Sequence, residues 1–310
     1  MSSPATAAEA VADAPASGAL NATRPFHWSL RRELWEYRSV YIAPLAAAGV
    51  ALFGFVVALP KLPGVVRALA KLPPMQQIAH LDQSYAFAAA AVLLCGVIVA
   101  LFYCLGALNG ERRDRSILFW KSLPVSDLTA VLAKVTVPLV VIPLVLFAVI
   151  VATQLLMLLL GSAVLLASGL GAGVIWSHWP VVGMTLGLAY IIVTLTLWYA
   201  PLYGWFLLVS GLARRVPILW AVLPPLGLCV VEKIGLGTNY IGALILYRFR
   251  GFALEGFTIP SSHGQQQVID PLALLTPARF FATPGLWLGL VFAVACFAAA
   301  VWLRRYRDPG

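Results

Sequence analysis

The chain alternates between long uncharged runs and short segments that hold nearly all of its charge. No Asp, Glu, Lys or Arg occurs between Tyr85 and Leu108 or between Val135 and Ala213. About 20 apolar residues in an α-helix cross the ~30 Å hydrocarbon core of a bilayer, and a helix satisfies its own backbone polar groups inside lipid. The pattern therefore predicts an all-α fold, that of a polytopic membrane protein.

Six membrane-spanning helices can be placed along these runs. We predict them at residues 40–59, 85–108, 135–160, 181–212, 216–234 and 285–303. The fourth is longer than a bilayer requires and contains Pro201, so we expect a kinked or tilted helix. The fifth is short, and we expect Pro224 and Pro225 to interrupt it.

Composition supports the same class. Of the 310 residues, 61% are hydrophobic, and the mean hydropathy is +0.91, above the values of soluble domains. The four cysteines lie in apolar runs without C-x-x-C spacing, so neither a disulfide framework nor a metal site is indicated.

Residues 1–23 lack a positive n-region and a continuous apolar stretch. We predict a disordered tail there, followed by one transmembrane domain at residues 24–310.

Orientation follows from the placement of basic residues, which accumulate on the cytoplasmic side of membrane proteins. Fourteen of the 21 Lys and Arg residues fall on one side of the predicted topology. The other seven are Lys61, Arg67, Lys71, Lys233, Arg248, Arg250 and Arg279. Both termini should therefore be cytoplasmic, in the inner (plasma) membrane. This bias accounts for the net charge of +9, and no base-reading motif points to nucleic acid.

The outer segment, residues 235–284, separates the fifth and sixth predicted spans. Its apolar part, residues 241–247, is too short to cross a bilayer, so we expect a re-entrant or interfacial helix on the outer side. From Arg248 to Pro284 the sequence is polar enough to be solvated.

A dense polar segment, Gly110 to Ser126, forms the cytoplasmic connection between the second and third predicted spans. Pro124 should end the preceding helix, and Ser126 or Asp127 is a plausible N-cap for the next one. Residues 111–122 can form a short helix with charges at one end and an apolar block at the other. Such a helix suits docking into a partner; an ordinary basic inside loop is the alternative.

A second amphipathic segment precedes the first span. One helical stripe, with spacings of three and four, contains Phe26, Leu30, Leu34, Tyr37 and Tyr41. The charged residues Arg31, Arg32, Glu33 and Glu36 should lie elsewhere on the surface, and Trp28 and Trp35 add interfacial aromatic rings. We expect this helix to lie in the plane of the inner membrane surface and to enter the first span at a bend. The alternative is a straight extension of the first span into the cytosol.

An interfacial helix, six spans and a charged cytoplasmic connection between the second and third spans follow one another along the chain. In this arrangement the chain resembles the permease subunits of ABC-2-type ABC transporters, from about Arg24 to Arg307. The resemblance rests on RRELWEYR before the first span and on SLPVSDLTAVLAK at the end of the cytoplasmic connection. It rests also on YAPLYGWFLLVSGLARRVPILWAVLPP, which looks like the corresponding region of a bacterial group of these permeases.

The resemblance implies a mechanism driven by ATP on a partner chain. The coupling helix of that family would fall on about residues 111–121 and would seat in a groove of a separate ATPase subunit. The residues implied in this contact are Glu111, Arg112, Arg113, Asp114, Arg115, Leu118, Phe119, Trp120 and Lys121. The residues implied for the interfacial helix are Trp28, Leu30, Arg31, Arg32, Leu34 and Trp35. Two ATPases and two permeases, as a homodimer or heterodimer, would export a substrate between the permeases.

This chain would then be a permease subunit and not an enzyme, without catalytic residues, cofactor or metal. It contains no G-x-x-x-x-G-K-[ST], so it has no P-loop to cradle ATP phosphates. Drug, peptide, lipid and polysaccharide exporters share this framework, so the cargo has to be argued from the site and not from the fold.

Two other classes of function remain open. A membrane-embedded enzyme would need converging polar groups, but the four histidines show no HExxH pattern and GxSxG is absent. A gradient-driven secondary transporter would need internal repeats and mid-membrane acids. Glu232, followed by Lys233, could lie in the outward part of a translocation path. The simpler interpretation is that this pair marks the outer end of the fifth span.

Overall fold

The computed structural model describes residues 25–69, 74–110, 126–171, 173, 176, 181–213, 215–257 and 275–306. Within these residues the fold is helical, apart from an isolated bridge between Phe257 and Leu275. The first half contains α1 (Pro25–Glu36), α2 (Ser39–Ala58), η4 (Leu59–Lys61), α3 (Leu62–Leu69), α4 (Pro74–Ala107), α7 (Asp127–Thr136), η5 (Val137–Val141) and α8 (Ile142–Ala167). The second half contains α10 (Val181–Leu212), α11 (Pro217–Gly235), α12 (Tyr240–Gly256), α13 (Pro277–Ala282) and α14 (Pro284–Tyr306).

Six helical segments of the described chain are long and apolar enough to cross a membrane. They are Ser39–Leu69, Gln83–Ala107, Asp127–Ala167, Gly183–Leu212, Pro217–Gly235 and Pro284–Tyr306. The prediction of an all-α fold with six helices long and apolar enough to cross a membrane is therefore confirmed.

The third span begins eight residues earlier than the apolar run suggests, at Asp127. Ser126 caps it, because its Oγ accepts a hydrogen bond from the backbone N–H of Thr129 at 3.1 Å; this confirms one of the two predicted caps. The helix then passes through π-type turns at η5, next to Pro138 and Pro143, whose rings cannot donate to the helical ladder.

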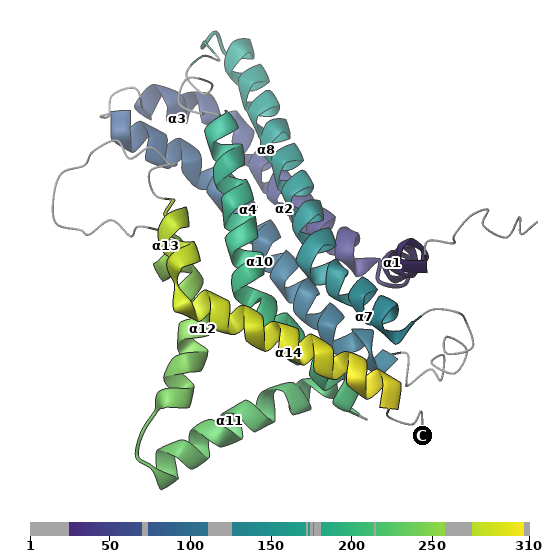
Figure 1. Ribbon diagram of the computed structural model, residues 1–310. Helices are drawn as coiled ribbons and strands as arrows, with labels where there is room; N and C mark the ends of the chain where they lie inside the picture. The colour runs from purple at the N-terminus through teal and green to yellow at the C-terminus, as the bar shows by residue number, and fades with distance from the viewer. Residues whose placement is uncertain are drawn as a thin grey trace, which may run out of the picture.

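Five of the six candidate spans share one core in the described part of the chain. Buried residues of α2, α4, α7–α8, α10 and α14 meet there, among them Val40, Val92, Ile150, Leu207 and Ala300. The remaining span, α11, adds nothing to this core. In Figure 1, α11 leaves the bundle and α12 returns toward α13, so that the two helices form the arms of a V.

The helix α11 runs without a break through Pro224 and Pro225, so the expected interruption was wrong. Pro225 has no N–H to donate to the carbonyl of Ala221, four residues before it. That carbonyl instead accepts a hydrogen bond from the indole of Trp205 on α10, at 3.0 Å. A side chain from the neighbouring helix thus replaces a backbone bond that proline removes.

The helix α12 is also longer than the apolar run at residues 241–247. It continues to Gly256, and both Gly251 and Gly256 are buried. Phe249, Arg250 and Leu254 of the same stretch are exposed, so the expected solvation from Arg248 onward stays a prediction. The stretch is held in place by the packing of Arg248 against α10 and α14, described below.

Candidate functional site at the ends of α4 and α7

The nine residues predicted to contact an ATPase lie in the segment 111–125, outside the described residues. The residues on both sides of this segment are described. Their contacts show which helices hold the two ends of the segment, and we describe the site through these contacts.

The entry to the segment is fixed to the end of α10. The backbone N–H groups of Leu108 and Asn109 both donate to the Oγ of Ser210, at 3.0 and 2.9 Å. The side-chain amide of Asn109 donates to the carbonyl of Ala213 at 2.7 Å. Ser210 is fully buried, so these bonds are shielded from competing water. The last turn of α4 and the last turn of α10 are consequently joined.

The exit from the segment is fixed to the end of α14. Asp127, the first residue of α7, accepts a hydrogen bond from the Nε of Arg304 at 3.0 Å. Arg304 is 8% exposed although it lies in the last turn of α14. An arginine there also complements the negative C-terminal end of its own helix.

A third connection ties both borders to α1. The carboxylate of Glu33 accepts from Lys134 Nζ at 2.7 Å and from the hydroxyl of Tyr103 at 2.9 Å. The exposed fractions of these three residues are between 1% and 3%. We call Glu33, Tyr103 and Lys134 the inner junction. Since Tyr103 belongs to α4 and Lys134 to α7, one carboxylate holds α1 against the two helices that border the segment.

The two faces of α1 have different surroundings. Leu30, Leu34 and Tyr37 from the predicted stripe pack against the shared core. Glu33 lies on this inner side, so its predicted surface position was wrong; the reason is the buried partner Lys134. Trp28 and Trp35, in contrast, are among the exposed large side chains.

The chain bends between α1 and α2. Only Tyr37 and Arg38 separate the two helices, and Figure 1 looks nearly along the axis of α1 while α2 runs across the view. A straight extension of the first span into the cytosol is thus not what the chain forms.

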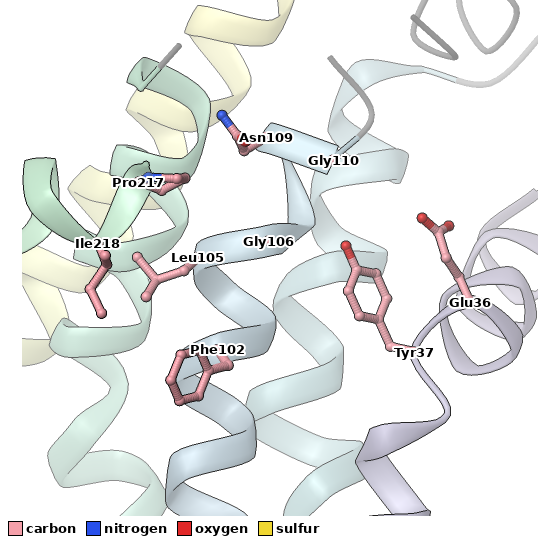
Figure 2. Close-up of a pocket in the computed structure, with 9 residues that line it drawn as sticks. All are labelled: Glu36, Tyr37, Phe102, Leu105, Gly106, Asn109, Gly110, Pro217 and Ile218. Atoms are coloured by element: carbon pink, nitrogen blue, oxygen red, sulfur yellow. The ribbon is translucent and has the colours of Figure 1, made fainter. Parts of the chain in front are cut away.

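A groove of about 480 Å³ opens beside this bend, and Figure 2 displays its walls. It is lined by Glu36, Tyr37, Phe102, Leu105, Gly106, Asn109, Gly110, Pro217 and Ile218. The ring of Tyr37 stands edge-on to Tyr103 with centroids 4.8 Å apart. Gly106 and Gly110 face the Tyr37 hydroxyl, so α4 and the bend approach each other closely. The groove adjoins the entry to the segment and is mostly apolar.

The carboxylate of Glu232 lies at the start of α12. It accepts hydrogen bonds from the backbone N–H groups of Tyr240 and Ile241 and from the hydroxyl of Thr238. Glu232 is 6% exposed, and these bonds satisfy N–H groups that the first turn of α12 leaves without helical partners. Its geometry is that of a helix cap; a role in a translocation path stays a prediction.

A second cluster, around Arg248 of α12, was missed from the sequence. The guanidinium lies over the ring of Trp198, 4.8 Å from its centroid, and donates to the carbonyls of Trp198 and Gly285 at 3.3 and 3.2 Å. In return, the indole of Trp198 donates to the carbonyl of Arg248 at 2.8 Å. A Cβ at Gly251 would collide with the same ring. We call Trp198, Arg248, Gly251 and Gly285 the outer clamp.

The outer clamp holds its cation without a carboxylate, since no ion pair of Arg248 is found in the described part of the chain. Partial burial lowers the pKa of its guanidinium from the ordinary value, while Tyr247 acts in the opposite direction. Arginine nevertheless stays protonated in proteins. The only available signal in the sequence was an arginine directly after a short apolar run.

Comparison of the chain with protein-family models, curated proteins and solved structures finds no match. Across the described residues, no group of three or more His, Cys, Asp and Glu side chains is arranged to hold a metal ion.

Proposed function

We propose that this chain is the permease subunit of an ABC-2-type ATP-binding-cassette exporter in the inner membrane. Both termini lie in the cytoplasm, and a separate ATPase subunit, present in two copies, docks on about residues 111–121, within the segment 111–125. A second permease copy completes the substrate path. One observation carries the proposal: both borders of this segment are fixed to the ends of α10 and α14 and, through Glu33, to α1.

The geometry supports a mechanical role for the segment. Closure of two ATPases around ATP displaces whatever is docked on them. A displacement of residues 111–125 pulls on α4 and α7 together, because the chain connects them directly. The inner junction transmits this movement to α1 and hence to α2. The bonds of Ser210 and Arg304 transmit it to α10 and α14. The spans are thereby biased between inward-open and outward-open arrangements.

The observations give the other classes of function less support. The gradient-driven alternative drew on Glu232, whose carboxylate is engaged by the first turn of α12. The enzyme alternative needs converging reactive groups, and the buried polar clusters described above consist of ion pairs, caps and backbone bonds. The permease function is the one that gives a role to the contacts at the two ends of the segment 111–125.

The proposal is tested by copurification from native membranes. Tagged chain is isolated in mild detergent, and a stoichiometric soluble protein with a Walker A sequence is expected to accompany it. A variant with Glu111, Arg112, Arg113, Asp114 and Arg115 changed to the matching uncharged amides or Gln should lose most of this partner. Arg215→Gln, an exposed change on the same side, serves as the control. If the variant with all five substitutions recovers as much ATPase as the wild type does, the coupling assignment is wrong.

A further inference from the structure

The exposed face of α1 has an unusual construction. Trp28, Arg31 and Trp35 are spaced by three and four residues and therefore share one helical face. The Cζ of Arg31 lies 5.5 Å from the ring centroid of Trp28 and 4.9 Å from that of Trp35. The two indoles are 57% and 68% exposed. One guanidinium is thus held between two outward-facing rings, on the side of α1 that points away from the buried Glu33.

The depth of this face in the membrane follows from the bend. The span α2 begins at Ser39, and the link from Glu36 is at most about 11 Å long even when extended. Ile42 and Leu45, on the first turns of α2, are exposed apolar residues that need a lipid environment. The helix α1 therefore lies at the level where α2 enters the hydrocarbon core, which is the level of the headgroups.

The charges around this face favour an anion. Arg31 forms no ion pair in the described chain, whereas its neighbour Arg32 lies near Glu33 and Glu36, at 3.3 and 3.5 Å. Glu33 is also committed to the inner junction. No free carboxylate of the described chain is therefore available beside Arg31 for the ammonium group of a zwitterionic lipid.

The donors are arranged for a phosphate. The guanidinium of Arg31 lies over the two indole rings, and its N–H groups form the fork that matches phosphate oxygens. The indole N–H groups of Trp28 and Trp35 donate no hydrogen bond to any described residue. Tryptophan is enriched at this level of the membrane, and the cytoplasmic leaflet is anionic.

We propose that Trp28, Arg31 and Trp35 form a binding site for the phosphate of an anionic phospholipid of the inner leaflet. The lipid holds the outer face of α1 at the membrane surface while Glu33 holds its inner face on α4 and α7. This site requires only the spans and the position of α1, so it stands independently of the ATPase partner.

The test uses native mass spectrometry of the delipidated full-length protein, titrated with phosphatidylglycerol and with phosphatidylcholine of the same chain length. Phosphatidylglycerol should bind more tightly to the wild type. Arg31→Gln should weaken it on the order of tenfold. The matched control is Arg38→Gln, an equal charge change at an exposed arginine without a stacking ring. It should change binding by less than about twofold. Arg31→Lys keeps the charge but loses the stacked fork and should resemble Arg31→Gln.

Three outcomes would overturn the site. Equal losses for the Arg31 and Arg38 variants would reduce the effect to general charge attraction. Equal binding of the two lipids would remove the specificity for an anion. If Arg31→Gln left phosphatidylglycerol binding intact but released a copurifying protein, the face would be a protein contact instead.

Discussion

Lys134 and Arg248 are two basic side chains that the chain withdraws from water in different ways. Lys134 is 1% exposed and meets the carboxylate of Glu33 at 2.7 Å. Arg248 is partly buried and rests on the ring of Trp198 and on backbone carbonyls. One cation is therefore neutralised by an opposite charge, while the other is held by several weaker dipolar partners.

The difference has consequences for how each region responds to change. A buried ion pair tolerates the loss of neither partner, because the remaining charge is left in a medium that solvates it poorly. The guanidinium of Arg248 is stabilised by one aromatic ring and two carbonyls, so a substitution that removes one of these partners removes only part of the stabilisation. The inner junction should therefore be the rigid region, next to the segment where we propose that force enters. Single substitutions in the outer clamp should lower the free energy of unfolding by less than those in the inner junction. Four substitutions test this contrast.

The largest effect is expected at the inner junction. Lys134→Met removes the closer of the two cations beside the buried Glu33 carboxylate and leaves Arg32 at 3.3 Å. It should lower the free energy of unfolding by up to about 3–5 kcal/mol. Unfolding in mixed micelles titrated with SDS measures it. The control Lys61→Met removes an exposed lysine and should change stability by less than about 0.5 kcal/mol. The double variant Glu33→Gln with Lys134→Met should regain much of the loss; if the single variant is as stable as wild type, the junction does not hold α1.

The next effect is expected where α12 touches Trp198. Gly251→Ala places a methyl group against the ring and should cost about 1–3 kcal/mol, measured by the same titration. Gly227→Ala is the matched control, because no atom lies within 4 Å of the position of its Cβ. That change should leave stability equal or raise it by up to about 1 kcal/mol, as expected for alanine in a helix. Similar effects at both glycines would mean that α12 does not pack on α10.

A smaller loss of stability is expected when Arg248, the cation of the outer clamp, is replaced. Arg248→Gln removes the contact with the ring and weakens the bonds to the two carbonyls, at a cost of about 1–2 kcal/mol. Arg250→Gln removes an exposed arginine of the same helix and should be nearly neutral. A loss at Arg248 that equals or exceeds the loss at Lys134 would contradict the contrast between the two regions.

The smallest effect is expected at the cap of α12. Glu232→Gln replaces a charged acceptor of backbone N–H groups by a weaker neutral one and should cost about 1 kcal/mol. The change should be local, so hydrogen–deuterium exchange at Tyr240 and Ile241 should accelerate while α4 and α10 stay protected. Unchanged exchange together with lost transport would assign Glu232 to the substrate path and not to the cap.

The spans could be predicted because the signal is local: length and apolarity of a single run decide each of them. The cap at Ser126 was predictable for the same reason. The inner junction was not, because Glu33 finds Lys134 across 101 positions of sequence. The outer clamp involves backbone carbonyls, which have no signature in a sequence. The intact helix through Pro225 depends on Trp205, whose indole replaces the lost bond from a different helix.

The central claim is that a helix at about residues 111–121 contacts an ATPase, and site-specific photocross-linking tests it most directly. A photoreactive amino acid placed at Trp120, in native membranes, should form a cross-link to a soluble protein that contains a Walker A sequence. The same group at Trp302, which is 61% exposed on a membrane span, should not capture that protein. If Trp120 cross-links only to lipid, or yields no protein adduct, the segment is an ordinary inside loop and the account of coupling is wrong.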